Sequence, residues 1–127
     1  MTTRVYTARI SYRGTDRLDV TRKSAKADGL PFAPSWAILG PALRLDPVSR
    51  AYAWPQYAAD YTSEMRASYR NERAAWDALL DRAEVTLVCY CTEAGMCHRR
   101  VLAEILARLG AIDCGERSTP GRSPIPA

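Results

Sequence analysis

One segment, residues 84–109 (EVTLVCYCTEAGMCHRRVLAEILARL), restricts the fold of this chain more than any other. Residues 85–91 are all β-branched, apolar or aromatic, which is typical of a strand buried on both faces in a parallel sheet. Apolar residues then recur three or four positions apart up to Gly110, and this spacing predicts a helix over residues 97–109. A buried strand followed closely by an amphipathic helix is typical of α/β folds.

Chemically reactive side chains gather between this strand and this helix. Three of the four cysteines and the only histidine lie within ten consecutive positions. In open parallel sheets, ligands bind where the carboxyl ends of strands meet the amino ends of helices, because backbone N–H groups and helix dipoles converge there. We therefore expect the functional site beside the loop at residues 92–96, surrounded by Cys91, Glu93, Cys97, His98 and Arg99.

The remaining sequence predicts further strands and helices. We expect strands at residues 4–12, 18–21 and 111–115, a short helix at 35–39 ended by Gly40-Pro41, and one long helix or two, with a break near Asn71, over 55–82. The predicted fold is α/β, a single three-layer Rossmann-like domain with a small, mainly parallel sheet flanked by helices. Residues 1–117 would form this domain, and residues 118–127, with three prolines, a mobile tail.

Length and composition suit one soluble domain. The chain has 127 residues, of which 47% are hydrophobic and 25% charged. The sequence shows neither a signal-peptide pattern nor an apolar run long enough to span a bilayer, so we expect a cytoplasmic location without a membrane partner. In that compartment the four cysteines are expected to be free thiols or metal ligands rather than disulfides.

The strand and helix around the cysteines resemble those of the domain-of-unknown-function 488 family. The resemblance rests on Cys89 near the strand end, on Cys97-His98-Arg99 at the helix start, and on Asp19-Val20-Thr21-Arg22 as the counterpart of an Asp-Val-Arg motif. It implies a Rossmann-like three-layer fold with the two motifs side by side at the carboxyl edge of the sheet, and it brings no established reaction. Cys91 stands where the family has an acidic residue, and Glu93 is the candidate substitute.

The residues of this segment suit nucleophilic or acid–base chemistry. Cys97, at a helix amino end beside arginines, is placed to lose its proton. Cys91 occupies the strand-end position of the nucleophile in rhodanese-like and tyrosine-phosphatase-like enzymes, but the C-x5-R signature of those phosphatases is absent, because Cys97 stands where the arginine would be. His98, oriented by Glu93 or Asp19, would serve as general acid or base. The candidate catalytic residues are therefore Cys91, Glu93, Cys97 and His98. The competing role for Cys97 and His98 is structural, with His98 bonded to a backbone carbonyl.

A metal site is the weaker interpretation of the same segment. Cys89, Cys91, Cys97 and His98 form the pattern C-x-C-x5-C-H, whereas zinc ligands normally come in C-x2-C pairs. The adjacent Cys97 and His98 diverge by about 100° around a helix, so at most three of the four side chains would share one ion. We assign no metal ligand and leave the cofactor open, and we expect Cys89 to be a buried, small apolar residue.

Anion binding is the interpretation that requires the fewest specific residues. Arg22 after a strand, Arg99 at a helix start and the amides of the intervening loop would hold a phosphate or carboxylate, and Tyr12 would line the same edge. The candidate ligand-binding residues are therefore Tyr12, Arg22 and Arg99. The favoured function is an enzyme, a hydrolase or transferase, acting on a phosphate-containing small molecule or nucleotide.

An arginine-rich helix offers an alternative function. The formal net charge is +4, and all but two of the basic residues are arginines, although a GC-rich genome produces the same bias. Arg66, Arg70 and Arg73 would lie along one side of the long helix, among aromatic residues that could stack on bases. The non-enzymatic alternative is therefore nucleic-acid binding, and a Cys/His metal-binding domain is the third hypothesis. We expect Tyr61 and Trp76 to belong to the core.

Overall fold

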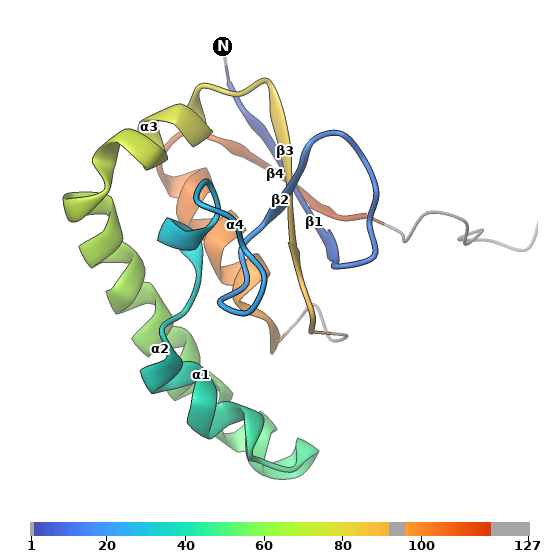
Figure 1. Ribbon diagram of the computed structural model, residues 1–127, viewed down its shortest axis with the longest axis vertical. Coiled ribbons are helices and arrows are strands. Elements are labelled where there is room, and N and C mark those ends of the chain that lie inside the picture. Colours follow the sequence, from blue (N-terminus) through green and yellow to red (C-terminus); the bar gives the residue numbers. More distant parts are fainter. Residues whose placement is uncertain (1, 92–95, 118–127) are drawn as a thin grey trace, which may run out of the picture.

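The structure is a computed structural model that describes residues 2–91 and 96–117 (Figure 1). Its elements follow in chain order: β1 (Arg4–Arg9), β2 (Arg17–Asp19), η1 (Leu30–Phe32), α1 (Trp36–Leu43), α2 (Pro47–Asn71), α3 (Arg73–Leu80), β3 (Glu84–Cys89), α4 (His98–Arg108) and β4 (Ile112–Glu116). Glu93, most of the predicted loop and the predicted tail lie outside the described residues. Within the described residues, no helix is long and apolar enough to cross a membrane.

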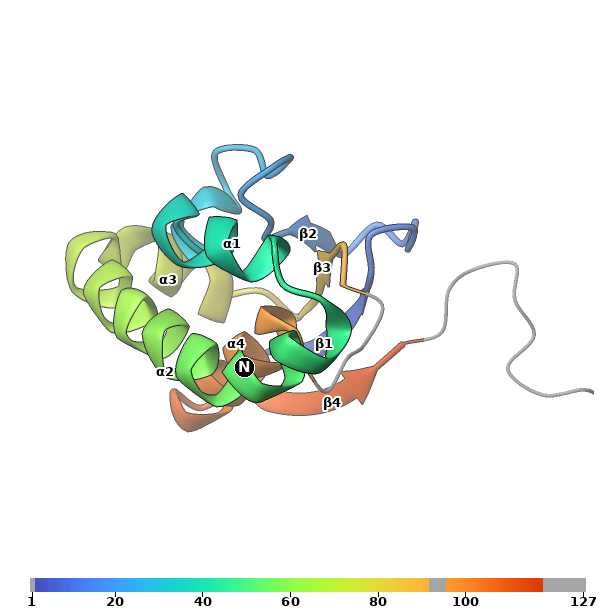
Figure 2. The same cartoon turned by 90° about the horizontal axis from the view of Figure 1, so that it is seen from below.

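The four strands form one parallel sheet in the order β2-β3-β1-β4, with β2 and β4 at opposite edges (Figure 2). In the register, Val85 of β3 lies opposite Val5 of β1, and Leu87 lies opposite Leu18 of β2. Val85 and Leu87 are completely buried, as the uninterrupted apolar strand predicts. Because the strands are parallel, their carboxyl ends all lie at the same end of the sheet, which is where the functional site is expected.

Helix α4 lies against the sheet, and α2 packs against α4 (Figures 1 and 2). Leu102 and Leu106 of α4 are completely buried, and Gly110 follows the helix with a positive φ of 111°. Tyr61 of α2 and Trp76 of α3 are also completely buried in this core, which confirms the role predicted for them. The α/β, Rossmann-like architecture predicted from the sequence is confirmed.

Helix α1 does not end where the sequence predicted. It continues through Gly40-Pro41 to Leu43. Pro41 lacks an N–H group and so removes one helical hydrogen bond, but it stands close to the end of a short helix. The final turn closes instead through the N–H of Arg44, which donates to the carbonyl of Pro41 at 3.2 Å.

Helix α2 begins at Pro47, well before the predicted start. Asp46 caps this helix, because its carboxylate accepts a hydrogen bond of 2.8 Å from the N–H of Ser49. Proline at the first helical position is favourable, so Asp46-Pro47 is a start signal that the prediction missed. Of the two alternatives predicted, one long helix or two with a break near Asn71, the structure has the second. As a result, α1 and the first turns of α2 extend beyond the carboxyl ends of the strands (Figure 1).

Candidate functional site

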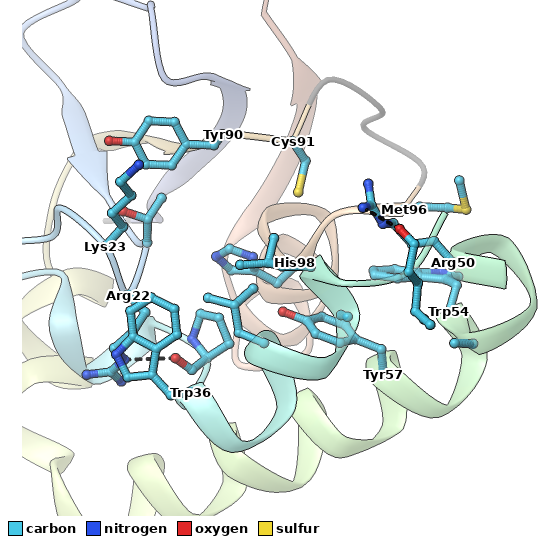
Figure 3. A pocket seen from close by; sticks show the side chains of 17 residues that line it. Arg22, Lys23, Trp36, Arg50, Trp54, Tyr57, Tyr90, Cys91, Met96 and His98 are labelled. Carbon is cyan, nitrogen blue, oxygen red and sulfur yellow. Dashed lines mark hydrogen bonds between the residues drawn. The ribbon is translucent and has the colours of Figure 1, made fainter. Parts of the chain in front are cut away.

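A cavity of about 360 Å³ opens at the carboxyl ends of β2 and β3 (Figure 3). The residues that follow these two strands and the start of α4 line one side, and α1 and α2 line the other. Most of the lining is apolar or aromatic and includes Trp36, Leu39, Leu43, Trp54, Tyr57 and Tyr90. The site therefore lies at the predicted edge of the sheet.

The segment that follows β2 is held in a tight turn. The Asp19 carboxylate accepts hydrogen bonds from the N–H and the hydroxyl of Thr21, at 2.9 and 2.6 Å. Burial opposes ionisation, but hydrogen bonds from Ser24 and Thr21 hold the pKa of Asp19 below its ordinary value. Asp19 is thereby committed to this turn and is not hydrogen-bonded to His98, which it was expected to orient.

His98 begins α4 and lines the cavity although only 5% of the residue is exposed. Its Nε2 lies 2.9 Å from the carbonyl oxygen of Val20. A carbonyl oxygen only accepts hydrogen bonds, so Nε2 carries the proton and Nδ1 of the neutral ring is unprotonated. Burial lowers the pKa of His98 to about 4, and the ring is neutral at physiological pH. This bond also joins the two sequence motifs side by side.

Three basic side chains line the cavity: Arg22, Lys23 and Arg50. Arg22 and Arg50 are each anchored to a backbone carbonyl, at 2.8 and 2.9 Å, and the Lys23 ammonium lies 5.6 Å from the centroid of the Tyr90 ring. Within residues 2–91 and 96–117, none of the three forms an ion pair. A cavity lined by cations without acidic partners in this part of the chain attracts anions.

Cys91 follows β3 and directs its free sulfur into the cavity (Figure 3). Burial raises the pKa of this thiol above its ordinary value, against the opposing charges of Arg99 and Arg50. The side chain is therefore a protonated thiol at neutral pH. Its backbone carbonyl accepts a hydrogen bond of 2.8 Å from Arg99, which fixes the chain at this point.

Arg99 is completely buried and does not line the cavity. Its guanidinium donates two hydrogen bonds to the Glu116 carboxylate of β4, at 3.1 and 2.9 Å. It also donates to the sulfur atoms of Cys89 and Cys97, at 3.0 and 3.3 Å. Together with the bond to the Cys91 carbonyl, these contacts occupy the guanidinium from several sides. The structure therefore does not bring Arg99 and Arg22 together around one anion.

Cys89 and Cys97 are joined as a disulfide, and each residue is only 1% exposed. The expectation that all cysteines are thiols or metal ligands is therefore wrong for these two. The reason is spatial, because α4 begins directly over the end of β3 and brings the two residues together. The sulfur atoms of Cys89, Cys91 and Cys97 all lie within 4.8 Å of one another, and among the described residues His98 does not join this cluster.

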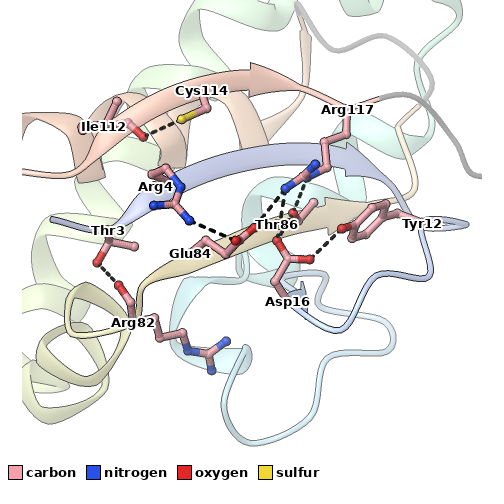
Figure 4. A network of polar contacts seen from close by, with 10 residues as sticks. All are labelled: Thr3, Arg4, Tyr12, Asp16, Arg82, Glu84, Thr86, Ile112, Cys114 and Arg117. Atoms are coloured by element: carbon pink, nitrogen blue, oxygen red, sulfur yellow. Dashed lines mark hydrogen bonds and ion pairs between the residues drawn. The ribbon is translucent and has the colours of Figure 1, made fainter. Parts of the chain in front are cut away.

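Tyr12 lies away from the cavity, on the sheet face turned from the helices (Figure 4). Its hydroxyl donates a hydrogen bond of 2.6 Å to Asp16, which also accepts one of 2.6 Å from Thr86 and pairs with Arg117 at 3.6 Å. Because β2 runs parallel to β1, the connection between them must return toward the amino ends of the strands. Tyr12 belongs to that connection. The prediction that it lines the same edge as Arg22 is therefore wrong.

The contribution of α1 and the start of α2 was missed by the sequence analysis. Trp36 of α1 and Trp54 of α2 face the cavity, where Trp54 stacks on Tyr57 with ring centroids 5.6 Å apart. The sequence signal that could have found them lies in the proline-rich stretch at residues 31–47, which contains large apolar side chains that are not buried in the core. Trp36 and Leu43 remain more than half exposed.

The predicted arginine face borders a second hollow, of about 260 Å³, between α2, α3 and α4. Arg66, Arg70 and Arg108 line it, and within residues 2–91 and 96–117 these three form no ion pair. Arg73 does not line the hollow, and it pairs with Asp77 at 3.0 Å. The hollow is thus basic, and it lies at the carboxyl end of α4, whereas the Cys97-His98-Arg99 motif lies at the amino end of that helix.

The comparisons with known proteins agree with the two motifs. A family model described as "Active DUF488-N3 subclade" matches residues 2–110, a range that includes both of them. Neither a curated protein nor a solved structure matches the chain. The match confirms the resemblance drawn from Asp19-Val20-Thr21-Arg22 and Cys97-His98-Arg99.

Proposed function

We propose, from the premise that this chain belongs to the DUF488 family in its active N3 subclade, that the cavity binds a nucleotide-like, phosphate-containing small molecule on which the protein acts as a hydrolase or transferase. One observation carries the proposal. A largely apolar cavity of about 360 Å³, with several aromatic side chains, is also lined by Arg22, Lys23 and Arg50, without an acidic partner in the described part of the chain. The description of the subclade as active supports catalysis over a purely structural role.

The cavity offers different surfaces to the two parts of such a ligand. Trp36, Trp54 and Tyr90 present aromatic surface on which a planar base can stack. Arg22 and Lys23 follow the carboxyl end of β2, close to the amino end of α4, where positive charge and the helix dipole both favour a phosphate. The volume falls within the range of small-molecule pockets.

His98 and Cys91 are the cavity groups that we assign to proton transfer. With Nε2 bonded to Val20, the unprotonated Nδ1 of His98 is the atom that accepts a proton from an attacking hydroxyl or water. An anionic ligand would raise the pKa of His98 from about 4 and make the ring a stronger base. Cys91, a protonated thiol, would donate to the departing group. We assign no step to Cys97 in its disulfide.

The test is a titration of the protein with adenosine monophosphate and with adenosine, followed by tryptophan fluorescence. Two of the three tryptophans, Trp36 and Trp54, line the cavity and report binding. Loss of one charge-assisted contact costs about 1.5–3 kcal/mol, so Arg22→Ala should weaken nucleotide binding roughly ten- to hundredfold. Lys26→Ala, at an exposed basic residue that lines neither this cavity nor the hollow beside α2, is the matched control and should bind as the unmodified chain does.

Two results would contradict this proposal. One is equal affinity for adenosine and its monophosphate, which would show that the basic side chains of the cavity do not bind the phosphate. The other is unchanged binding by Arg22→Ala. If nucleotide binds, turnover is measured as release of phosphate or base, and His98→Gln should abolish turnover while leaving binding within a few fold.

A second candidate function rests on the basic hollow between α2, α3 and α4. Arg66, Arg70 and Arg108 would contact the phosphates of a nucleic acid there. Binding of DNA or RNA would then weaken steeply as the salt concentration rises. Arg66→Ala or Arg70→Ala would each reduce the slope of the logarithm of the binding constant against the logarithm of the salt concentration by about one. Salt-independent retention, or no retention at low salt, would exclude this candidate.

A further inference from the structure

Three cysteines meet at the carboxyl end of β3, and they are not equivalent. Cys89 and Cys97 form the disulfide and are almost completely buried, whereas Cys91 is a free thiol in the lining of the cavity. All three sulfur atoms lie within 4.8 Å of one another. A small thiol reagent in the cavity therefore meets Cys91 first, and Cys91 is within a short movement of the buried pair.

Arg99 lies directly beside these sulfur atoms. One terminal nitrogen of its guanidinium donates to the sulfur atoms of Cys89 and Cys97, at 3.0 and 3.3 Å, and to the Cys91 carbonyl at 2.8 Å. A cation that donates hydrogen bonds to sulfur favours the thiolate over the thiol. The sulfur released when this disulfide opens would therefore be stabilised where it stands, and a stabilised thiolate leaves faster.

We propose that Cys89, Cys91 and Cys97 form a thiol–disulfide exchange centre, in which Cys91 carries two electrons between a small dithiol in the cavity and the buried disulfide. This activity is separate from the proposed action on a phosphate-containing ligand and does not depend on it. The partner is a low-molecular-weight dithiol. It is small because the cavity has a volume of about 360 Å³, and it carries two thiols because the second one releases Cys91 from the mixed disulfide.

The exchange balances in three steps. The Cys91 thiol gives its proton to water in the cavity and its sulfur attacks Cys97, so that a Cys91–Cys97 bond forms and Cys89 leaves as a thiolate beside the Arg99 cation. The Cys89 thiolate then takes up a proton from water. One thiol of the external dithiol then attacks Cys91, and Cys97 leaves with a proton. The second external thiol attacks its own mixed disulfide and frees Cys91. The external dithiol is thereby oxidised to a disulfide, and the protein disulfide is reduced to two thiols.

Attack on Cys97 rather than on Cys89 follows from the backbone. Cys89 and Cys91 are two positions apart at the end of an extended strand, where a disulfide between them would need a strongly bent chain. Cys97 approaches instead from the start of α4. Cys91 is therefore the residue that reacts with the external dithiol. Cys97 is the residue that forms a disulfide with either Cys89 or Cys91.

The test compares Cys91→Ser with Cys114→Ser during reduction of the oxidised, folded protein by dithiothreitol. Cys114 is an exposed free thiol of β4 and is the matched control. New thiols are alkylated at intervals and counted by mass spectrometry. We expect Cys114→Ser to be reduced at the rate of the unmodified chain and Cys91→Ser roughly tenfold more slowly or worse. Equal rates for the two variants would overturn the proposal.

A second variant keeps the proposal testable if Cys91→Ser alters the fold. In Cys89→Ser, mild oxidation should produce a Cys91–Cys97 disulfide, identified by peptide mapping. Failure of this bond to form in folded protein would overturn the proposal. Elemental analysis of the fully reduced chain gives the remaining outcome, because stoichiometric zinc bound by the three thiolates would replace the exchange centre with a metal site.

Discussion

Acidification from pH 7 to pH 5 should destabilise this protein through one side chain, His98. The ring is buried, donates a hydrogen bond to the Val20 carbonyl and packs edge-on against Tyr61, with ring centroids 5.2 Å apart. Desolvation by burial is the main cause that lowers its pKa to about 4 from the ordinary value of 6.5. The chain contains no other histidine, so no other imidazole titrates in this interval.

The sign and the size follow from proton linkage. Between pH 6.5 and about pH 4 the unfolded chain binds a proton on His98 that the folded protein does not, so the stability falls as the pH falls. With those two pKa values, the free energy of unfolding drops by about 2 kcal/mol between pH 7 and pH 5, and by about 3 kcal/mol by pH 4. The contribution of His98 is fully present above its unfolded pKa.

Urea unfolding at a series of pH values measures this loss directly. His98→Gln keeps an N–H donor for the Val20 carbonyl but cannot titrate, so its stability should be nearly flat from pH 7 to pH 5. Asp19 and Glu116, whose pKa values are also lowered, lose their contributions at more acidic pH in both chains. A flat profile for the unmodified protein, or equal slopes for the two chains, would refute the reasoning. Ring-proton NMR should likewise place the midpoint near 4 rather than 6.5.

Two further predictions concern the core and the strand end. Arg99→Met should lower the free energy of unfolding by about 3 kcal/mol, because Arg99 is completely buried and its loss removes the bonds to Glu116 and to the Cys91 carbonyl, whereas Arg100→Met, at a pair whose arginine is partly exposed, should cost about 1 kcal/mol. Equal costs in urea unfolding would show that burial does not matter here. Gly29→Ala should cost about 1–3 kcal/mol, because a Cβ there would collide with the Asp19 carbonyl, while Gly40→Ala in open space on α1 should be neutral or slightly stabilising. A calorimetric melting temperature for Gly29→Ala at or above that of Gly40→Ala would contradict the close contact.

Local pattern was sufficient to predict much of the fold. The apolar run that became β3 and the helical spacing that became α4 are each read within a few neighbouring residues, because a strand or helix repeats its own period. The same is true of Gly110, which ends α4, and of the burial of Tyr61 and Trp76. Where a start signal was overlooked, as at Asp46-Pro47, the information was nevertheless local.

The candidate site was predicted only in part, because proximity in sequence does not decide which way a side chain points. Cys91, His98 and Arg22 do meet at one cavity, as their positions at strand ends and a helix start suggested. Arg99, directly after His98, turns about 100° further around the helix and enters the core, where Glu116 of β4 receives it. Nothing in the spacing of the motif distinguishes these two orientations.

By itself, therefore, the sequence determined the elements, their order and the edge of the sheet at which reactive residues gather. The tertiary structure decided how these elements meet. The strand order β2-β3-β1-β4 placed Glu116 on Arg99, the parallel return of the chain took Tyr12 away from the site, and the helices α1 and α2 closed the cavity. The physical reason is that periodicity and capping act between neighbours along the chain, whereas a cavity and a disulfide depend on distances between segments that only packing sets.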